Sequence, residues 1–315
     1  MVKKLITCLT VIFLCISALA LQADAGGLLA FVRDGNIWVA ASDGSGAREL
    51  TTSGQAEAPA LSWDGKWVAF TSRAGDKVGI GLVSSAGGAV KRLTLPGIAD
   101  AWSPAFFPDG KKLALVTRFN IRTETFDGDK QEMATHAVSV MDLDSGKLRH
   151  LVTYPNHLWD MGDIYENLVV SPDGRLIAYQ ESGTDVSGGF VVLNLQGRPV
   201  GRYPRNPEKD YRPFWRPTFS PDGGKMLCFS MAISEGEKTY IYLVDLQTWK
   251  ATRITTGYYP TFVDGGKAIV FERWTETGRS GRAGTKIDLW RLDSSFGAQP
   301  RLILEDAEKP AGLGG

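Results

Sequence analysis

A short turn motif that recurs along the chain constrains the fold more than any other feature of the sequence. Proline presets φ, aspartate accepts hydrogen bonds from the backbone that follows it, and glycine takes the positive φ that closes the reversal. Neighbouring copies lie 42 to 64 residues apart, so each copy marks one unit of an internal repeat. The five copies are Ser62–Lys66, Phe107–Lys111, Ser171–Arg175, Ser220–Gly224 and, with weaker agreement, Val263–Lys267.

Each copy of the motif is followed by an apolar run with a small residue before its last large one. The small residue recurs as Ala69, Ala114, Ala178, Cys228 and Val270. Such a run predicts a strand that is buried on both faces, as stacked sheets require. The free cysteine among them is therefore predicted to be a small core residue rather than a reactive thiol.

Two further strand-like runs complete each unit, and four short strands per repeat are typical of a β-propeller. Five complete blades are expected to begin near residues 54, 96, 155, 204 and 257. The opening segment 27–53 supplies only three strands, and the tail after Leu304 is expected to add the missing inner one. The sequence thus predicts an all-β, six-bladed propeller of four-stranded antiparallel blades, with its ring closed by the two termini. A β-sandwich is the second choice, but it would not repeat one strand–turn formula five times.

The repeat can be compared with a known family. Its turn at Ser171–Arg175, the strand end Ala69–Phe70, the turn Asp43–Gly46 and the closing run Arg48–Thr51 together resemble the TolB-type propeller repeat. The resemblance covers nearly all of residues 26–315. TolB itself carries an α/β domain before its propeller, whereas Leu28–Val32 is expected to be the first propeller strand here, so we expect no such domain.

The first 25 residues have the pattern of a cleavable signal peptide. Lys3 and Lys4 precede the mostly apolar stretch Leu5–Ala20, and small residues allow cleavage after Ala20 or, preferably, after Ala25. The interpretation places the mature protein in the periplasm or outside the cell. Two alternatives remain open, an uncleaved membrane anchor and lipid attachment at Cys15.

Charge and cysteine content narrow the range of partners. Lysine plus arginine and aspartate plus glutamate both number 35, so bulk charge gives no reason to expect nucleic acid or an anionic membrane surface as a partner. Contact with a membrane is expected only through the signal peptide or a protein partner. Removal of the signal leaves Cys228 as the single cysteine, so no internal disulfide is expected.

A binding site is predicted on the face opposite the repeated turns, because there the repeats differ from one another. Insertions are expected at 117–136, 181–189, 232–239 and 273–285, and long inter-blade segments at 154–166 and 203–216. These segments lead into the innermost strands, so their ends should meet at the mouth of the central channel. The candidate binding residues are Trp102, Trp159, Asp160, Tyr165, Glu166, Tyr211, Arg212, Trp215, Arg216 and Tyr259. Aromatic rings with arginines and carboxylates suit a polar or peptide ligand, although some of these aromatics are needed to pack blades together.

Catalytic groupings are not recognised in the sequence. The three histidines, His136, His150 and His157, are scattered, and no Gly-x-Ser-x-Gly nucleophile motif occurs. We therefore expect no catalytic residue, metal or cofactor, and the leading hypothesis is a non-catalytic propeller that binds an envelope protein or peptide. One alternative is a saccharide-acting enzyme or sensor that uses Glu166 with Asp160 or Asp163 as acid and base. Another is a structural part of a larger assembly.

Overall fold

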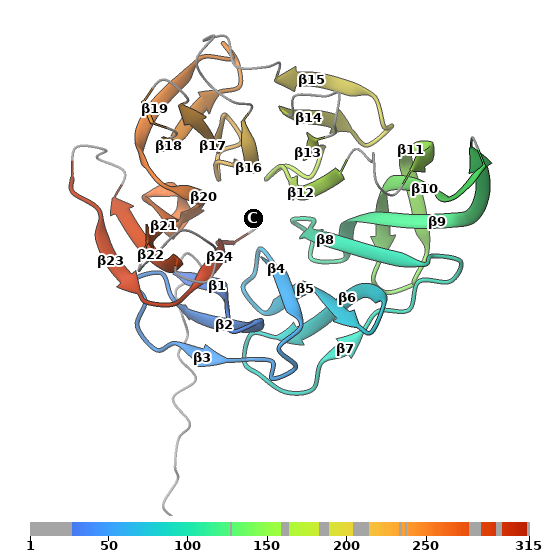
Figure 1. Ribbon diagram of the computed structural model, residues 1–315. Coiled ribbons are helices and arrows are strands. Elements are labelled where there is room, and N and C mark those ends of the chain that lie inside the picture. The colour runs from blue at the N-terminus through green and yellow to red at the C-terminus, as the bar shows by residue number, and fades with distance from the viewer. Residues whose placement is uncertain are drawn as a thin grey trace, which may run out of the picture.

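The computed structural model shows a ring of β-sheets around a central channel (Figure 1). It describes residues 27–126, 128–158, 164–182, 189–203, 214–232, 235–236, 238–276, 285–293 and 298–313. The predicted signal peptide, residues 1–25, lies outside these ranges. Within them, no helix has the length and apolar character needed to span a bilayer.

The sheets are six four-stranded antiparallel blades, as predicted. We number them from the blade that contains the first strand and give the strands from the channel outward. Blade I has β24 (Glu308–Ala311), β1 (Leu28–Arg33), β2 (Asn36–Ala41) and β3 (Arg48–Glu49). Blade II has β4 (Ala56–Leu61), β5 (Trp67–Ala74), β6 (Lys77–Ser84) and β7 (Lys91–Arg92). Blade III has β8 (Asp100–Phe106), β9 (Lys112–Phe126), β10 (Asp129–Asp142) and β11 (Leu148–Leu158).

The remaining blades follow the same plan. Blade IV has β12 (Ile164–Val170), β13 (Leu176–Ser182), β14 (Gly189–Asn194) and β15 (Pro199–Tyr203). Blade V has β16 (Trp215–Phe219), β17 (Lys225–Ala232), β18 (Lys238–Asp245) and β19 (Ala251–Thr256). Blade VI has β20 (Tyr258–Val263), the 3-10 turn η1 (Asp264–Gly266), β21 (Ala268–Glu276), β22 (Thr285–Asp293) and β23 (Arg301–Leu304).

The two ends of the described chain close the ring, which confirms the predicted closure. Strand β24 pairs antiparallel with β1, and Ala311 lies opposite Ala30. Beyond β24, the Gly312 N–H donates to Thr261 Oγ1 of blade VI at 3.0 Å, and Leu313 forms a bridge with Leu61 of blade II. The C-terminal segment therefore ties three consecutive blades together.

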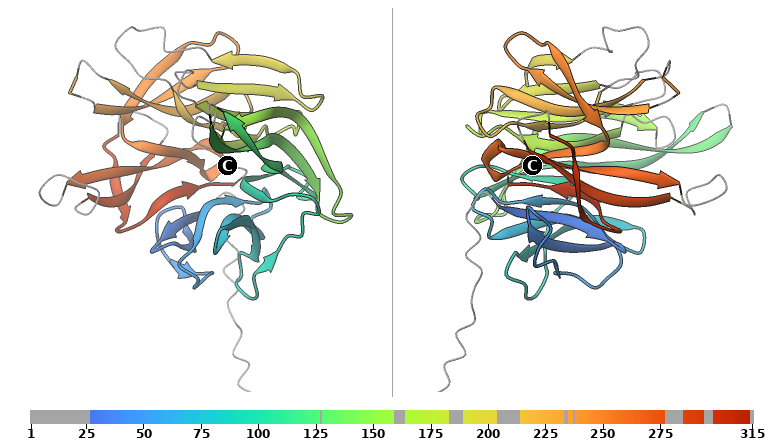
Figure 2. Two further views of the ribbon diagram at one scale, coloured as in Figure 1. Left: turned by 45° about the vertical axis from the view of Figure 1, so that its right-hand side comes forward. Right: turned by 90° about the vertical axis from the view of Figure 1, so that its left-hand side faces the viewer.

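The core lies between successive blades. The predicted small residues of the second strands are fully buried there, among them Ala69, Ala114, Ala178 and Cys228. Burial raises the pKa of the Cys228 thiol well above its usual value, which keeps the thiol protonated. One predicted insertion takes a different form, because most of residues 117–136 extend β9 and β10 into a long hairpin that reaches beyond the body of the ring (Figure 2).

The Asp-Gly turns that reveal the repeat all lie at one end of the blades, and we call this end the turn face. In each copy with the Ser-x-Asp pattern, the serine and aspartate side chains form hydrogen bonds with each other and with the backbone of the same turn. In blade IV, for example, Ser171 Oγ donates to Asp173 and accepts the Leu176 N–H. Neighbouring turns also lie close together: if Gly174 carried a Cβ, that atom would lie 3.3 Å from the Pro108 ring of the preceding turn.

The fifth, weaker copy folds differently, as η1. Val263 stands where the other copies have serine or phenylalanine, and Asp264 has a positive φ of 53°. Asp264 instead accepts a hydrogen bond from Ser42 and pairs with Arg291, so it links blades VI and I.

Candidate functional site

Every inner strand carries a bulge where it borders the channel. In β8, for example, the pairing register with β9 shifts between Trp102 and Ala105. One residue of each bulge has a φ between 48° and 55°, which is the left-handed region. These residues, which we call the bulge ring, are Ala58, Ser103, Asn167, Arg216, Tyr259 and Lys309. Such a backbone costs a non-glycine residue about 1–2 kcal/mol and is seen most often where side chains must be aimed at a site.

Polar side chains of the preceding blade hold the backbone of several bulges in place. The Ser103 N–H donates to Thr71 Oγ1, and the Asn167 N–H donates to Ser103 Oγ, both at 3.1 Å. The Arg216 N–H donates to Gln180 Oε1 at 3.3 Å, and the same oxygen accepts the Asn167 side-chain amide. These contacts join blades II to V in sequence.

The same kind of contact continues around the rest of the channel. Thr218 Oγ1 donates to the Pro260 carbonyl, and the Lys309 N–H donates to Glu272 Oε1 at 2.6 Å. The Lys309 ammonium lies 3.4 Å from the Glu57 carboxylate. Every one of the six blade interfaces thus has at least one polar contact beside the channel. The bulge ring is therefore held by partners that are distant in the sequence.

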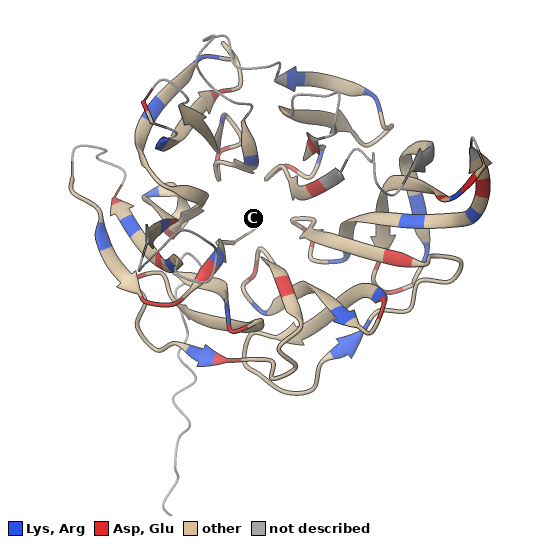
Figure 3. Ribbon diagram, viewed as in Figure 1, with Lys and Arg blue, Asp and Glu red and all other residues tan. Residues whose placement is uncertain are grey.

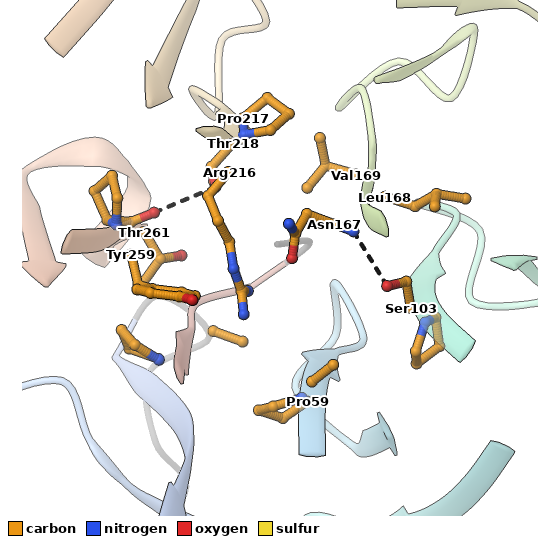
Figure 4. Close-up of a pocket in the computed structure, with 15 residues that line it drawn as sticks. Pro59, Ser103, Asn167, Leu168, Val169, Arg216, Pro217, Thr218, Tyr259 and Thr261 are labelled. Atoms are coloured by element: carbon orange, nitrogen blue, oxygen red, sulfur yellow. Dashed lines mark hydrogen bonds between the residues drawn. The ribbon is translucent and has the colours of Figure 1, made fainter. Parts of the chain in front are cut away.

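The bulge ring surrounds a small hollow in the channel (Figure 4). Its volume is about 40 Å³, which is room for a few water molecules or one small functional group. All six inner strands line it, through residues that include Ala58, Ser103, Asn167, Arg216, Tyr259 and Pro310. We call this hollow, with the bulge ring and the residue preceding each bulge residue, the channel mouth.

The bulge ring is chemically lopsided. Blades V, VI and I contribute Arg216, Tyr259 and Lys309 to it, whereas blades II to IV contribute the smaller, uncharged Ala58, Ser103 and Asn167. The guanidinium carbon of Arg216 lies 4.3 Å from the centre of the Tyr259 ring, and the end of the side chain points into the hollow (Figure 4). Arg216 Nε is buried without a hydrogen-bond partner, and no ion pair of Arg216 occurs among the described residues. Its outer nitrogens are therefore the groups that can donate to a ligand.

Glu272 is a buried carboxylate that binds the backbone of the bulge ring at Lys309. It is 1% exposed and accepts the Lys309 N–H on Oε1 and the Trp274 indole N–H on Oε2. Burial raises the pKa of Glu272, and the two hydrogen bonds and Arg216 partly oppose that rise. Burial likewise raises the pKa of Tyr259.

Neither sign of charge dominates the mouth. Glu57 is paired with Arg73 at 2.9 Å and with Lys309. Glu166 and Glu308 lie close enough to Tyr259 to raise its pKa, opposite in effect to Arg216. Across the whole ring, basic and acidic residues are interspersed (Figure 3). The mouth therefore offers both hydrogen-bond donors and acceptors to a ligand.

Of the candidates from the sequence, Arg216 and Tyr259 line the hollow, and Glu166 directly precedes the bulge residue Asn167. Two tryptophans pack between blades: Trp102 lies edge-on to His136 at 5.7 Å between ring centres, and Trp215 contacts Phe229 at 5.7 Å. The remaining candidates, Trp159, Asp160, Tyr211, Arg212 and the side chain of Tyr165, lie outside the described residues.

Sequence reasoning missed four members of the bulge ring, Ala58, Ser103, Asn167 and Lys309. A signal for them was present, because proline follows the bulge residue in five of the six inner strands. Among the described residues there is no group of three or more His, Cys, Asp or Glu side chains arranged to hold a metal. His150 packs on Phe119 and bonds Ser139, and burial lowers its pKa.

Comparison with known proteins establishes the fold. No protein-family model and no curated protein sequence matches the chain. The structure is similar to that of TolB from Acinetobacter baumannii, with a TM-score of 0.63, 20% identity, and coverage of 90% of this chain and 66% of the TolB chain. The chain thus spans just under two thirds of the length of that protein. The TolB-type propeller predicted from the repeat is confirmed at the level of the fold.

Two other solved structures share this fold with different contexts. A chain of a nidogen–laminin complex gives a TM-score of 0.61 at 12% identity, with 91% of this chain and 98% of that chain covered. An oligogalacturonate lyase from Vibrio parahaemolyticus gives 0.55 at 12% identity, with 86% and 71% covered. The fold is therefore compatible with both binding and catalysis, and function has to be argued from the mouth itself.

Proposed function

We propose that this protein is an exported, non-catalytic β-propeller that binds a protein or peptide partner in the cell envelope. The partner binds at the channel mouth and at the variable loops on the face opposite the turn face. The observation that carries the proposal is Arg216, whose guanidinium rests on Tyr259 and enters the hollow without an ion pair among the described residues. An arginine held in this way is preorganised to donate to a carbonyl or carboxylate of a ligand.

The composition of the mouth favours a polypeptide as that ligand. A peptide backbone presents alternating donors and acceptors. The mouth offers the Arg216 guanidinium as a donor, and the carboxylates Glu166 and Glu308 directly precede the bulge residues Asn167 and Lys309. The hollow of about 40 Å³ admits one carbonyl or carboxylate, whereas a pyranose ring is too large for it. A chain of this fold is part of the solved nidogen–laminin complex, which agrees with a binding role.

A co-purification experiment tests the proposed site. The full chain is expressed in its own host with an affinity tag, as wild type, Arg216→Ala or Arg253→Ala. Arg253 is the matched control, because it also lies over a tyrosine ring, Tyr240 at 4.0 Å, but on the outer strand β19 and paired with Glu235. We expect partner recovery to fall at least tenfold for Arg216→Ala and to stay within twofold for Arg253→Ala. Equal recovery with all three proteins would contradict the site.

Export is tested separately by the mass of the mature protein. We propose cleavage after Ala25, so the purified envelope fraction should contain a chain that begins at Gly26. A protein that retains Met1 and stays in the cytoplasmic fraction would refute export. That result would leave the binding chemistry of the mouth to be judged on its own experiment.

A further inference from the structure

One aromatic side chain beside the mouth is exposed and yet held rigidly. Trp274, near the end of β21, is 46% exposed. Its indole stacks on the ring of Tyr258, with 4.4 Å between ring centres and 14° between planes, and its N–H donates to Glu272 Oε2 at 2.6 Å. Two independent contacts therefore fix the orientation of the indole while much of its surface stays in water.

The contrast with Trp67 shows that this arrangement is not the usual state of a surface tryptophan. Trp67 is 43% exposed, on β5 at the turn face. In the described part of the chain, its side chain makes neither a ring contact nor a hydrogen bond. An exposed indole that is held in one orientation loses little conformational freedom when a ligand packs on it, which is why tryptophan is enriched among residues that anchor partners.

A single carboxylate connects Trp274 to the channel mouth. Glu272 accepts the Trp274 indole N–H on one oxygen and the N–H of the bulge residue Lys309 on the other. Tyr258, which covers one face of the indole, directly precedes Tyr259 of the hollow. The tryptophan is therefore linked to the channel mouth within blade VI, through Glu272 and through Tyr258.

We propose that Trp274 is the outer apolar anchor of the channel-mouth site, and that the ligand is an extended peptide segment with a proline or aromatic side chain. That flat side chain packs on the face of the indole that Tyr258 leaves uncovered, while a carbonyl or carboxylate of the same segment reaches Arg216. Glu272 acts as a positioning residue for both ends of the site. The inference rests on the proposed function, because it names the class of peptide that the mouth accepts.

An array of random octapeptides, acetylated and amidated at their ends, tests the inference with the full mature chain. We expect wild-type protein to select peptides that contain proline or an aromatic residue. The affinity of the best peptide, measured by fluorescence polarisation, should fall at least tenfold for Trp274→Ala and less than threefold for Trp274→Phe, which keeps a flat ring. The matched control Trp67→Ala should stay within twofold of wild type.

The positioning role of Glu272 has its own readout. Glu272→Gln should weaken binding and also change the near-ultraviolet circular dichroism of the free protein, because the indole loses its fixed orientation. The Trp274→Phe background should remove most of that spectral change. Unchanged spectra and affinity for Glu272→Gln would overturn this role.

The failure of the anchor and the failure of the proposed function give different results. If Trp274→Ala binds the selected peptide as wild type does while Arg216→Ala does not, the anchor is wrong and the peptide-binding function stands. If wild-type protein selects no peptide, the inference is wrong, and the co-purification experiment decides whether the binding function stands. Selection of oligosaccharides instead of peptides would make both wrong. Thermal melting of each variant shows whether the ring is folded. The choice of peptides by wild-type protein needs no variant, so a selection without proline or aromatic residues would overturn the inference even if Trp274→Ala unfolds.

Discussion

The turn face and the channel mouth are built from the same repeat but are held together in different ways. At the turn face, a residue such as Ser171 bonds partners two and five positions away, Asp173 and Leu176. At the mouth, the backbone of Arg216 is bonded by Gln180 of the preceding blade. The turns repeat because each satisfies itself locally, whereas the bulge ring keeps one backbone shape and changes its side chain in every blade.

This difference separates scaffold from site. Where polar groups are satisfied locally, one short motif works in each blade and its sequence stays uniform. Where the backbone is held from the neighbouring blade, the bulge residue does not have to satisfy its own turn. Side chains as different as those of Ala58 and Arg216 therefore occupy equivalent positions, and Ser103 uses its side chain to hold the next bulge.

A methyl group at Gly312, where the closing segment lies against blade VI, should destabilise the protein more than one inside a locally bonded turn. A Cβ there would lie 1.9 Å from the Phe262 carbonyl oxygen, so the segment after β24 would have to move away from blade VI. We expect Gly312→Ala to lower the free energy of unfolding by about 3 kcal/mol in urea denaturation. Gly224→Ala is the control, because its nearest atom, Asp222 Oδ1, is 3.6 Å away and its φ is not in the left-handed region. Similar losses for both variants would contradict the comparison.

Removal of a hydrogen bond from either region should lower the stability of the protein. Only a removal at the channel mouth should also weaken partner binding. Gln180→Leu leaves the Arg216 N–H and the Asn167 side-chain amide without their acceptor, which costs about 2 kcal/mol. Ser171→Ala removes two local bonds and should cost about 1–2 kcal/mol. Urea denaturation gives the stabilities, and partner recovery gives the binding. We expect recovery to fall for Gln180→Leu alone, and a matching fall for Ser171→Ala would show that the turn is part of the site.

Glu272 should give the smallest effect, visible as a pH dependence. Its pKa is raised in the folded protein, so the folded state holds the proton more tightly than the unfolded state. The stability that this group contributes is therefore largest below its ordinary pKa and falls as pH rises through the folded pKa. Glu272→Gln cannot ionise, so its stability relative to wild type should be more favourable at pH 8 than at pH 4.5. A difference that stays constant or reverses would show that Glu272 keeps its charge in the fold.

The carboxylates of the turn face act in a different pH range. Hydrogen bonds from Ser171 and from the backbone of Arg175 lower the pKa of Asp173. The stability from such groups is present above their ordinary pKa and is lost only as pH falls below it. Above pH 4.5, the difference in stability between Glu272→Gln and wild type therefore reports on Glu272 and not on the carboxylates of the turn face.

The sequence predicted the propeller well because its turns are local. Ser171, Pro172, Asp173 and Gly174 specify one reversal by themselves, and repetition of that formula counts the blades. The closing strand was also predictable, since the opening segment lacked one strand. The weaker copy at Val263 could not be resolved as η1, because its aspartate contacts residues far away in the sequence, Ser42 of blade I and Arg291 of its own blade.

The site was predictable only in part because its residues are defined by non-local contacts. Loop length pointed to the end of the inner strands where the bulge ring lies, and to Arg216 and Tyr259. It also pointed to Trp215, which packs on Phe229 of its own blade in the apolar layer between blades V and VI. It missed Lys309 and Glu272, since a bond between a closing strand and a buried carboxylate leaves no pattern in either local sequence.

Photocrosslinking at one position on each face shows which face meets the partner. Benzoylphenylalanine replaces Ala58 in the bulge ring or the exposed Lys111 in an Asp-Gly turn, in the full chain within living cells of its own host. The account predicts that position 58 crosslinks to a defined partner and that Arg216→Ala removes this product, while position 111 gives no product of that mass. A partner captured at position 111 and not at position 58 would contradict the assignment of the channel mouth as the binding site.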